Sequence, residues 1–310
     1  KGKGKIYRIK PHREEEFFVN EDHILHLQRT TVKEKEERNY PQQVNISVKD
    51  YLNWDKTRKH LYKLIKKEVK RYGNESKDLP LDPYFLGLWL GDGNCSLRTT
   101  VITNSDKEVK DYLENFAKKQ GVNFVEKLNH NRFSKTKGLF NPLTLKLREL
   151  IGDNKKHIPL QYLTSSVENR LLLLAGLIDT DGYYAPKRGR YEITTIYEQL
   201  GKDLYQLVNS LGLFSQIVLK KVKCSNCPNM SKDYKAWRIS FRQSEDIPCL
   251  VERKKPIPKQ YAIKSSRQGF KIEYSGEDFY YGFNLSGNQL YLDGKFIVHH
   301  NSGKSLFVSE

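Results

Sequence analysis

A nine-residue pattern that ends in an acidic residue and a glycine occurs twice in this sequence. Residues 85–93 read FLGLWLGDG and residues 174–182 read LAGLIDTDG, so Asp92 and Asp181 take the same position in the two copies. Two carboxylates held close together repel each other, and such a pair shares a proton or binds a cation. Oxygen ligands suit magnesium, which completes its shell with water and phosphate oxygens. The repeated pattern therefore predicts a paired metal site with the parts that phosphodiester hydrolysis needs.

The repetition extends well beyond the nine residues. Residues 102–121 and 193–212 each begin with Ile and end with Gly, and the two halves close on the similar strings KKHIP, at 155–159, and KKPIP, at 254–258. Repetition over such a length indicates an internal duplication. We expect two copies of one unit, related by a pseudo-twofold axis, between about Asp82 and Pro258.

Lysines in the closing strings could stabilise developing negative charge or position the attacking water. Lys156 and Lys255 occupy matching places in the two strings, and they are the predicted catalytic lysines. Their neighbours Lys155 and Lys254 are the alternatives.

Two apolar segments, residues 84–90 and 167–180, predict buried helices that end at the two acids. A glycine within each helix, Gly87 and Gly176, costs about 1 kcal/mol relative to alanine. That cost is understandable if the two backbones approach closely at a helix crossing, which would bring the helix ends together. The glycine after each acid is expected to take the left-handed conformation and stop the helix. The alternative is an ordinary helix pair in a hydrophobic core.

Composition indicates the class of partner. The chain has 54 Lys and Arg against 37 Asp and Glu, a net charge of +17 in 310 residues. An excess of this size favours a polyanion such as nucleic acid. No apolar run approaches the roughly 20 residues of a membrane span, and no secretory signal is recognisable. We therefore expect a soluble protein of the cytoplasm, or of the interior of a phage or virus host cell, that contacts no membrane. Residues 224–227, CSNC, are read as a turn in preference to a zinc site.

The doubled pattern resembles the motif of LAGLIDADG homing endonucleases, which the second copy matches at eight of nine positions. The resemblance implies an α+β fold of two αββαββα-like halves, whose four-stranded sheets lie over the major groove of a double-stranded DNA homing site. It implies Mg²⁺-dependent cleavage of both strands. Carried over by position, the catalytic and metal-binding residues are Asp92 and Asp181, with Gly91 and Thr180 as further metal ligands and Lys156 and Lys255 as lysines. Segments expected to read bases are 94–104, 123–145, 183–195 and 216–242.

The residues 299–302, HHNS, carry a second kind of chemistry. Asn301 can attack its own main-chain carbonyl through its side-chain amide, which forms a succinimide and cleaves the chain. A neighbouring histidine can polarise that carbonyl or protonate the leaving amine, and Ser302 can accept an acyl group. The alternative is an exposed polar turn.

Residues 280–301 resemble the C-terminal splicing motif of inteins, and residues 20–23, NEDH, resemble the motif with Thr or Asn three residues before a histidine. The similarity is greatest to yeast vacuolar ATPase-type inteins. It implies a β-rich, horseshoe-shaped Hint splicing domain interrupted by the endonuclease, with no cofactor for splicing. Implied splicing residues are Asn20 and His23 for the first acyl shift, His300 and Asn301 for cyclisation, and Ser302 as acyl acceptor.

The resulting domain organisation has four parts. Residues 1–76 and 264–301 would form the splicing domain, 77–263 the endonuclease with halves at about 82–160 and 167–258, and 302–310 the start of the host protein. The string SGKSLFVSE at 302–310 resembles the end of a phosphate-binding loop, which implies a P-loop ATPase host, by likeness a phage terminase large subunit.

Two departures from the intein pattern stand out. Inteins begin with Cys or Ser, whereas this sequence opens KGKGKIYRIK, which implies a missing N-terminal segment, present in cis or as a split partner. Gly282 and Gln289 replace an Asp and a His of the downstream motif, which places more of the burden on His300. The alternatives are a free-standing endonuclease or maturase-like RNA-binding protein without splicing, and a remnant that binds DNA without cutting it.

Overall fold

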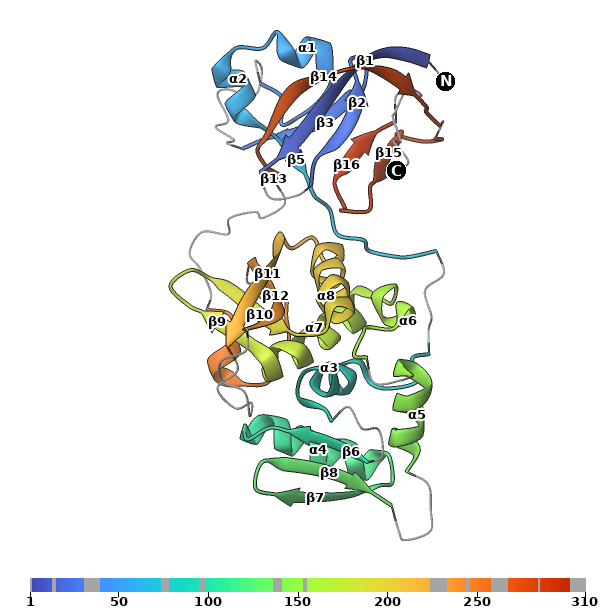
Figure 1. The fold of residues 1–310 in the computed structure, drawn as a ribbon, viewed down its shortest axis with the longest axis vertical. Helices are drawn as coiled ribbons and strands as arrows, with labels where there is room; N and C mark the ends of the chain where they lie inside the picture. Colours follow the sequence, from blue (N-terminus) through green and yellow to red (C-terminus); the bar gives the residue numbers. More distant parts are fainter. Residues whose placement is uncertain are drawn as a thin grey trace. The chain divides into compact units, whose positions relative to one another are not determined.

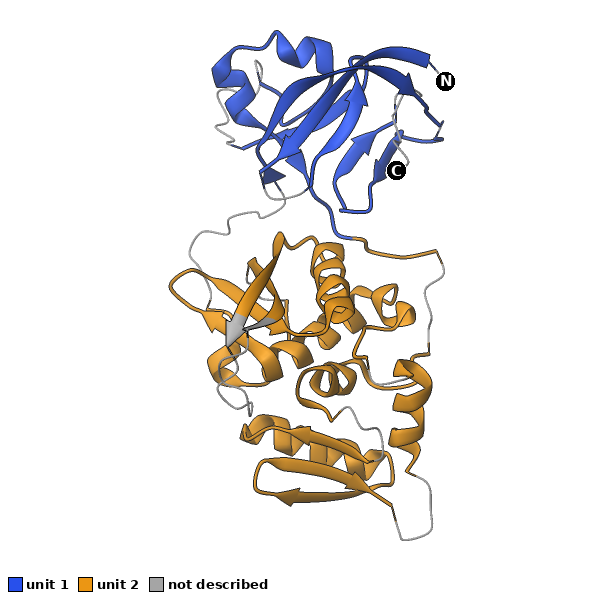
Figure 2. Cartoon of the chain, viewed as in Figure 1, with its two compact units in different colours: residues 1–68, 263–310 blue, residues 69–262 orange. Residues whose placement is uncertain are grey.

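The computed structural model describes residues 2–12, 15–30, 40–73, 78–94, 99–135, 141–152, 155–223, 233–242, 246–257, 267–283 and 285–301. The chain divides into two compact units (Figure 2). Unit 1 comprises residues 1–68 and 263–310, and unit 2 comprises residues 69–262. The boundaries expected from the sequence followed residues 76 and 263.

Unit 1 is rich in β-structure and is built from both ends of the sequence (Figure 1). Strand β1 (Gly2–Pro11) pairs antiparallel with β14 (Phe270–Tyr280), and its other edge pairs with β2 (Phe17–Asn20). Ile9 and Ile297 belong to the same buried cluster, so the two sequence segments share one core. The remaining elements are β3 (Ile24–Arg29), β4 (Gln43–Ser47), α1 (Val48–Leu52), α2 (Lys56–Leu61), β5 (Tyr62–Ile65), β13 (Arg267–Gln268), β15 (Leu290–Leu292) and β16 (Val298–His300).

Unit 2 contains two similar sets of elements around one hydrophobic core. The first half has a sheet of order β6-β8-β7 and the second half a sheet of order β11-β12-β10-β9. Elements of the first half are α3 (Pro83–Asp92), β6 (Thr100–Thr103), α4 (Lys107–Lys119), β7 (Asn123–Lys127), β8 (His130–Ser134), α5 (Pro142–Ile151) and α6 (Leu160–Leu163). Elements of the second half are α7 (Val167–Asp181), β9 (Gly182–Ala185), β10 (Arg190–Thr195), α8 (Glu198–Ser210), β11 (Ser215–Lys223), β12 (Asp233–Arg242) and the 3₁₀ turn η2 (Glu252–Lys254).

The two halves repeat the same local pairing. Gly93 forms a β-bridge with Ile102 in the first half, and Gly182 pairs with Ile193 in the second. These are the residues that the sequence repeat aligns. The second sheet has the expected four strands. Among the described residues the first sheet has three, with the Gly93 bridge where a fourth would begin.

Helices α3 and α7 cross at their glycines, as the sequence predicts. A Cβ atom on Gly87 would lie 2.3 Å from the Leu173 carbonyl oxygen, and one on Gly176 would lie 2.3 Å from the Tyr84 carbonyl oxygen. Only hydrogen therefore fits at either position. The crossing holds the two acid-bearing helices backbone to backbone.

The glycines after the acids end the helices in a way that differs from the expectation. Gly93 and Gly182 have φ of −75° and −76°, so both are extended and neither is left-handed. Space is what selects glycine here. A Cβ on Gly93 would meet the Trp89 carbonyl oxygen at 2.3 Å, and one on Gly182 would meet Ile178 at 2.6 Å.

Gly176→Ala is expected to destabilise unit 2 by about 3 kcal/mol or more, because overpacking against a backbone that cannot shift is costly. Gly73→Ala is the matched control, since a Cβ there meets nothing within 4 Å. Denaturant unfolding followed by tryptophan fluorescence measures both. Equal stability of the two variants would contradict the close crossing.

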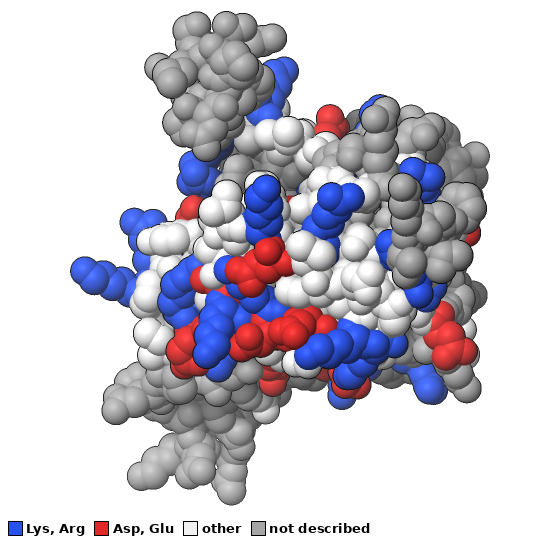
Figure 3. Space-filling model, turned by 90° about the horizontal axis from the view of Figure 1, so that it is seen from below, with Lys and Arg blue, Asp and Glu red and all other residues white. Residues whose placement is uncertain are grey.

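Charged side chains of both signs are mixed on one face of the molecular surface. On the face drawn in Figure 3, Lys and Arg side chains lie between Asp and Glu side chains. This agrees with a sequence in which basic residues are spread along the chain.

Within the described residues, no helix has both the length and the apolar character that crossing a membrane requires.

Candidate active site

The first candidate site lies in unit 2, where the ends of α3 and α7 meet. A Cβ on Gly91 would lie 2.0 Å from the Thr180 hydroxyl oxygen, so the residues preceding the two acids are in contact. The Thr180 hydroxyl donates to the Gly176 carbonyl oxygen at 2.9 Å, which fixes it against its own helix. Asp92 and Asp181 follow directly, and the crossing therefore delivers both acids to one place.

The two carboxylates influence each other electrostatically. The Asp181 side chain reaches solvent, but protein atoms around its carboxylate limit its hydration and raise its pKa to about 6. The negative charge of the nearby Asp92 is the second cause of this increase. Burial also raises the pKa of Asp92, against the opposing effects of Asn104 and Lys156. A pair of acids that disfavours its own ionisation is suited to a cation.

One buried lysine lies at each helix end. Lys156 donates to the Gly91 carbonyl oxygen at 2.6 Å, and Lys254 donates to the Ile178 and Thr180 carbonyl oxygens, both at 2.8 Å. Lys156 also lies over the rings of Trp89 and Tyr197, 5.5 and 5.9 Å from their centroids.

The structure places Lys255 away from the acids. Its side chain is exposed and bonds Glu252 at 2.6 Å. Lys254, which the sequence offered as an alternative, takes the place equivalent to Lys156. The two KK strings are therefore out of step by one residue, because the η2 turn ends at Lys254 and Lys255 resumes an extended backbone.

The donor set at the helix ends fits a hard divalent cation. Asp92 and Asp181 supply carboxylates, and Gly91 and Thr180 supply main-chain oxygens that accept from the lysines in this structure. Such oxygens, with water and phosphate completing the shell, are what Mg²⁺ prefers. The described residues contain no cluster of three or more His, Cys, Asp or Glu side chains arranged for a metal, so solvent and substrate would supply the remaining ligands. The CSNC string lies outside the described residues.

The second candidate site lies in unit 1 and combines residues from the two ends of the sequence. The rings of His23 and His299 are 5.9 Å apart, and Asn301 is buried, with its N–H donating to the Gln289 carbonyl oxygen at 2.7 Å. Asn20 is buried as well, and its main-chain carbonyl oxygen accepts a hydrogen bond from the His23 main-chain N–H at 3.2 Å. Ser302 and the residues after it lie outside the described residues.

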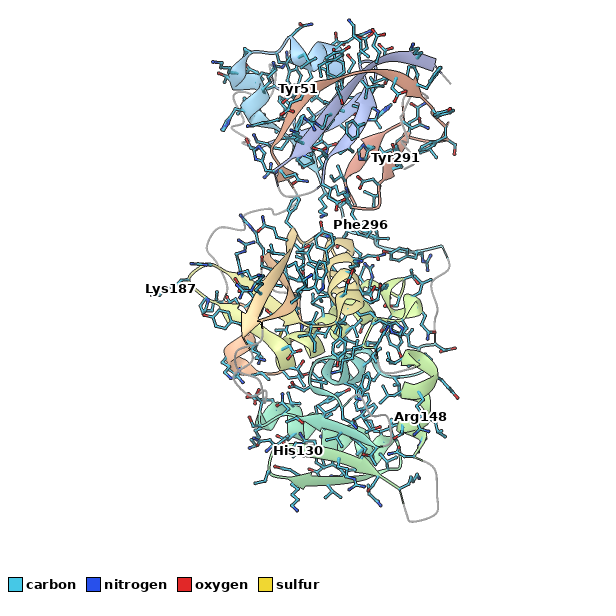
Figure 4. All side chains as sticks on the ribbon, in the orientation of Figure 1. Tyr51, His130, Arg148, Lys187, Tyr291 and Phe296 are labelled. Carbon is cyan, nitrogen blue, oxygen red and sulfur yellow. The ribbon has the colours of Figure 1, made fainter. Side chains whose placement is uncertain are left out.

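His299 has a more ordered environment than the sequence indicated. Its Nε2 lies 3.1 Å from an Asp293 oxygen, and its ring stacks on Tyr291, labelled in Figure 4, at 5.4 Å. Burial opposes ionisation of Asp293, but the hydrogen bond from His299 lowers its pKa overall. Burial lowers the pKa of His300. The resemblance to inteins assigned the cyclisation step to His300, whereas the structure places Asp293 and Tyr291 beside His299.

His23 is expected to make the stability of unit 1 depend on pH. Burial, followed by His299 and His300, lowers the pKa of His23 to about 3, against 6.5 in a free histidine. The folded form thus binds this proton more weakly than the unfolded form. Its stabilising contribution is present above about pH 6.5 and is lost as the pH falls toward 3. Denaturant unfolding between pH 7 and 4 should show a smaller decline for His23→Gln than for the wild type; equal declines would contradict this.

Comparison with known proteins gives a family match for part of the chain. Residues 168–235, from α7 to the start of β12, match a model described as a LAGLIDADG-like domain. The replicative DNA helicase DnaB of Mycobacterium intracellulare is 33% identical over 154 residues, covering 48% of this chain and 23% of the relative. The ATP-dependent DNA helicase Hel308 of Thermococcus kodakarensis is 28% identical, covering 71% of this chain and 21% of the relative.

The homothallic switching endonuclease of Saccharomyces cerevisiae is 22% identical, covering 68% of this chain and 42% of the relative. This chain thus spans less than half the length of each of these three relatives. Among solved structures, variants of the homing endonuclease I-DmoI align at 15% identity with a TM-score of 0.35, covering 54% of this chain and 91% of theirs.

Proposed function

We propose that unit 2 is a site-specific, metal-dependent endonuclease that cuts both strands of double-stranded DNA. The observation that carries this proposal is the pairing of Asp92 and Asp181 at two crossed helix ends, each beside its own buried lysine. One acid and one lysine in each half provide a set for each DNA strand. The LAGLIDADG-like match of residues 168–235 and the likeness to the homothallic switching endonuclease support it.

Each group at the site has a role in this reaction. Asp92 and Asp181, with the main-chain oxygens of Gly91 and Thr180, would hold Mg²⁺. The ion would activate a water molecule and neutralise charge on the scissile phosphate. Lys156 and Lys254 place ammonium groups where negative charge develops, and the net charge of +17 attracts the DNA backbone.

Lys254→Met is expected to slow cleavage of one DNA strand by about a hundredfold, the usual effect of removing one charge-stabilising donor. Lys255→Met is the matched control, because the Lys255 side chain is exposed and bonds Glu252. A supercoiled plasmid library with a randomised insert, incubated with magnesium, reports nicked and linear DNA.

Slower strand cleavage by Lys255→Met, together with wild-type cleavage by Lys254→Met, would contradict the assignment of Lys254. Retention of plasmid on a filter without any cut product, in the wild type, would instead favour a remnant that binds DNA. Retention of RNA in preference to the plasmid would favour a maturase-like protein.

We also infer that unit 1 supports cleavage of the peptide bond after Asn301, as in protein splicing. The specific observation is that the buried rings of His23 and His299, from opposite ends of the sequence, lie 5.9 Å apart, and that the buried Asn301 follows His299 by two residues. The Asn301 side-chain nitrogen would attack its own carbonyl carbon, forming a succinimide and breaking the bond to Ser302. The leaving amine takes a proton, for which His299, bonded to the Asp293 carboxylate, is a suitable donor.

The range of relatives supports this second proposal. The chain covers only 21% and 23% of two helicases with different names, while it also resembles an endonuclease. Such a pattern is expected of a separable segment carried by different host proteins. In this proposal the Ser302 hydroxyl is the acceptor in the acyl transfer of protein splicing. The residues after Ser302 belong to the host protein, a P-loop ATPase.

Mass spectrometry of the purified chain after incubation tests the inference. Loss of the nine residues 302–310, SGKSLFVSE, supports it. A bond between Asn301 and Ser302 that stays intact from pH 5 to 9, with and without a thiol, would leave unit 2 as an endonuclease without splicing activity.

A further inference from the structure

The two buried lysines are carried by segments with little regular structure of their own. Lys156 lies in residues 155–159, which form neither helix nor strand, and Lys254 ends the three-residue turn η2. The backbone of such a segment adopts one position only if groups outside it hold it. The positions of the lysines therefore depend on what their segments bond.

Asp179 holds the segment of Lys254. Its side chain is fully buried on α7, one position before Thr180. One carboxylate oxygen accepts the Leu250 N–H at 2.7 Å and the Tyr84 hydroxyl at 2.7 Å, and the other accepts the Val251 N–H at 3.4 Å. The same helix end therefore binds the segment twice, through Asp179 near its start and through the Lys254 ammonium group at its end.

Asp203 holds the segment of Lys156. It lies on α8 and is buried, and one of its oxygens accepts the Ile158 N–H at 2.9 Å. Its other oxygen accepts the Gln199 side chain at 2.8 Å, which fixes the carboxylate on its helix. Ile158 follows Lys156 by two residues, so this bond holds the segment on the C-terminal side of its lysine. Asp179, by contrast, holds the other segment on the N-terminal side of Lys254.

The two carboxylates are not copies of each other. The residue that matches Asp179 in the first motif is Leu90, and the residue that matches Asp203 in the first repeat is Tyr112. Both carboxylates therefore belong to the second half, one holding the lysine of its own half and the other the lysine of the first half, and neither has a counterpart in the first half. Two unrelated anchors can be removed one at a time.

We propose that Asp179 and Asp203 are positioning residues, each of which holds one lysine at the end of one motif helix by binding the backbone of the lysine's segment. Asp179 bonds the backbone at Leu250 and Val251, and Asp203 bonds it at Ile158, so each acts on its lysine through the chain; Asp179 also acts on Lys254 through its charge. The consequence for DNA cleavage rests on the proposed endonuclease function, whereas the positions of the lysines do not.

Competitive acetylation of the full-length protein with acetic anhydride, read by mass spectrometry, measures the exposure of each lysine. Asp179→Leu, which keeps the size of the side chain but removes both acceptor oxygens, should raise labelling of Lys254 by about tenfold, the factor that corresponds to one hydrogen bond to a charged group. Lys156 should stay at its wild-type level. Asp203→Leu should give the opposite result, with Lys156 released and Lys254 unchanged.

General destabilisation raises labelling of both lysines together, and that result in either variant would overturn the proposal. So would unchanged labelling of both. Tyr84→Phe provides a second test that keeps the fold: it removes one partner of Asp179 but leaves the bonds to Leu250 and Val251. Lys254 should then label as in the wild type, and release of Lys254 by Tyr84→Phe alone would show that the segment is held in another way.

The plasmid library extends the test to function. Asp179→Leu and Asp203→Leu should each convert the protein into a nicking enzyme, and the two variants should spare opposite strands. Selective labelling without any cut by the wild type would leave the positioning roles standing and contradict the endonuclease proposal. Cleavage of both strands at wild-type rate by a variant with a released lysine would overturn the link between lysine position and cutting.

Discussion

Asp181→Asn and Asp92→Asn are each expected to reduce magnesium-dependent DNA cleavage by at least about a hundredfold. Asparagine has nearly the size of aspartate but no negative charge, so the helix crossing is retained while the attraction for a cation falls. The two acids belong to different halves. Each variant should therefore lose mainly one cut, and nicked plasmid should accumulate in place of linear plasmid.

The same substitutions separate activity from folding. Because Asp92 adds to the raised pKa of Asp181, neutralising either acid removes a repulsion from the folded protein. Both variants should unfold at denaturant concentrations no lower than the wild type. Asp111→Asn, an exposed acid on α4, is the matched control. Wild-type cleavage by all three variants would exclude the helix ends as the site.

Asn301→Ala is expected to abolish release of residues 302–310 completely. The side-chain amide is the nucleophile of the proposed cyclisation, and alanine supplies no group that could take its place. His299→Ala should slow the release without abolishing it, because His300 remains. The measurement is the mass of the chain over time.

Asn53→Ala is a suitable control for Asn301→Ala, since Asn53 is an exposed helix-capping residue of the same unit. It should release the peptide at the wild-type rate. Release from Asn301→Ala at any measurable rate would mean that hydrolysis, and not cyclisation, breaks the bond.

The sequence predicts the helix pair well because sterics at a few positions are decisive. Gly87 and Gly176 have no other explanation in mid-helix, and the structure gives each a backbone neighbour that excludes a Cβ. The same argument misjudged Gly93 and Gly182. A glycine is required wherever a Cβ atom does not fit. The residue type alone therefore does not distinguish steric crowding from a left-handed backbone.

The lysines show a different limit. Each KK string offers two side chains, and the choice between them depends on where a single 3₁₀ turn ends. That turn is held by Asp179, which lies far away in the sequence. In unit 1, likewise, the intein pattern favoured His300, but Asp293 and Tyr291 lie beside His299. Local patterns locate such sites, and long-range contacts decide which residue of a pair occupies them.

The construction of unit 1 from both ends of the sequence also sets an order in time. His23 is made early, but β14, which completes its sheet, and the strand that carries His299 are made last. Chains begin to fold from the N-terminus during synthesis, so unit 2 can fold while unit 1 still lacks β13, β14, β15 and β16. The pair of His23 and His299 beside Asn301 cannot form until these strands have been made. In the proposed splicing reaction, cyclisation of Asn301 therefore has to wait until unit 2 has left the ribosome and unit 1 has closed.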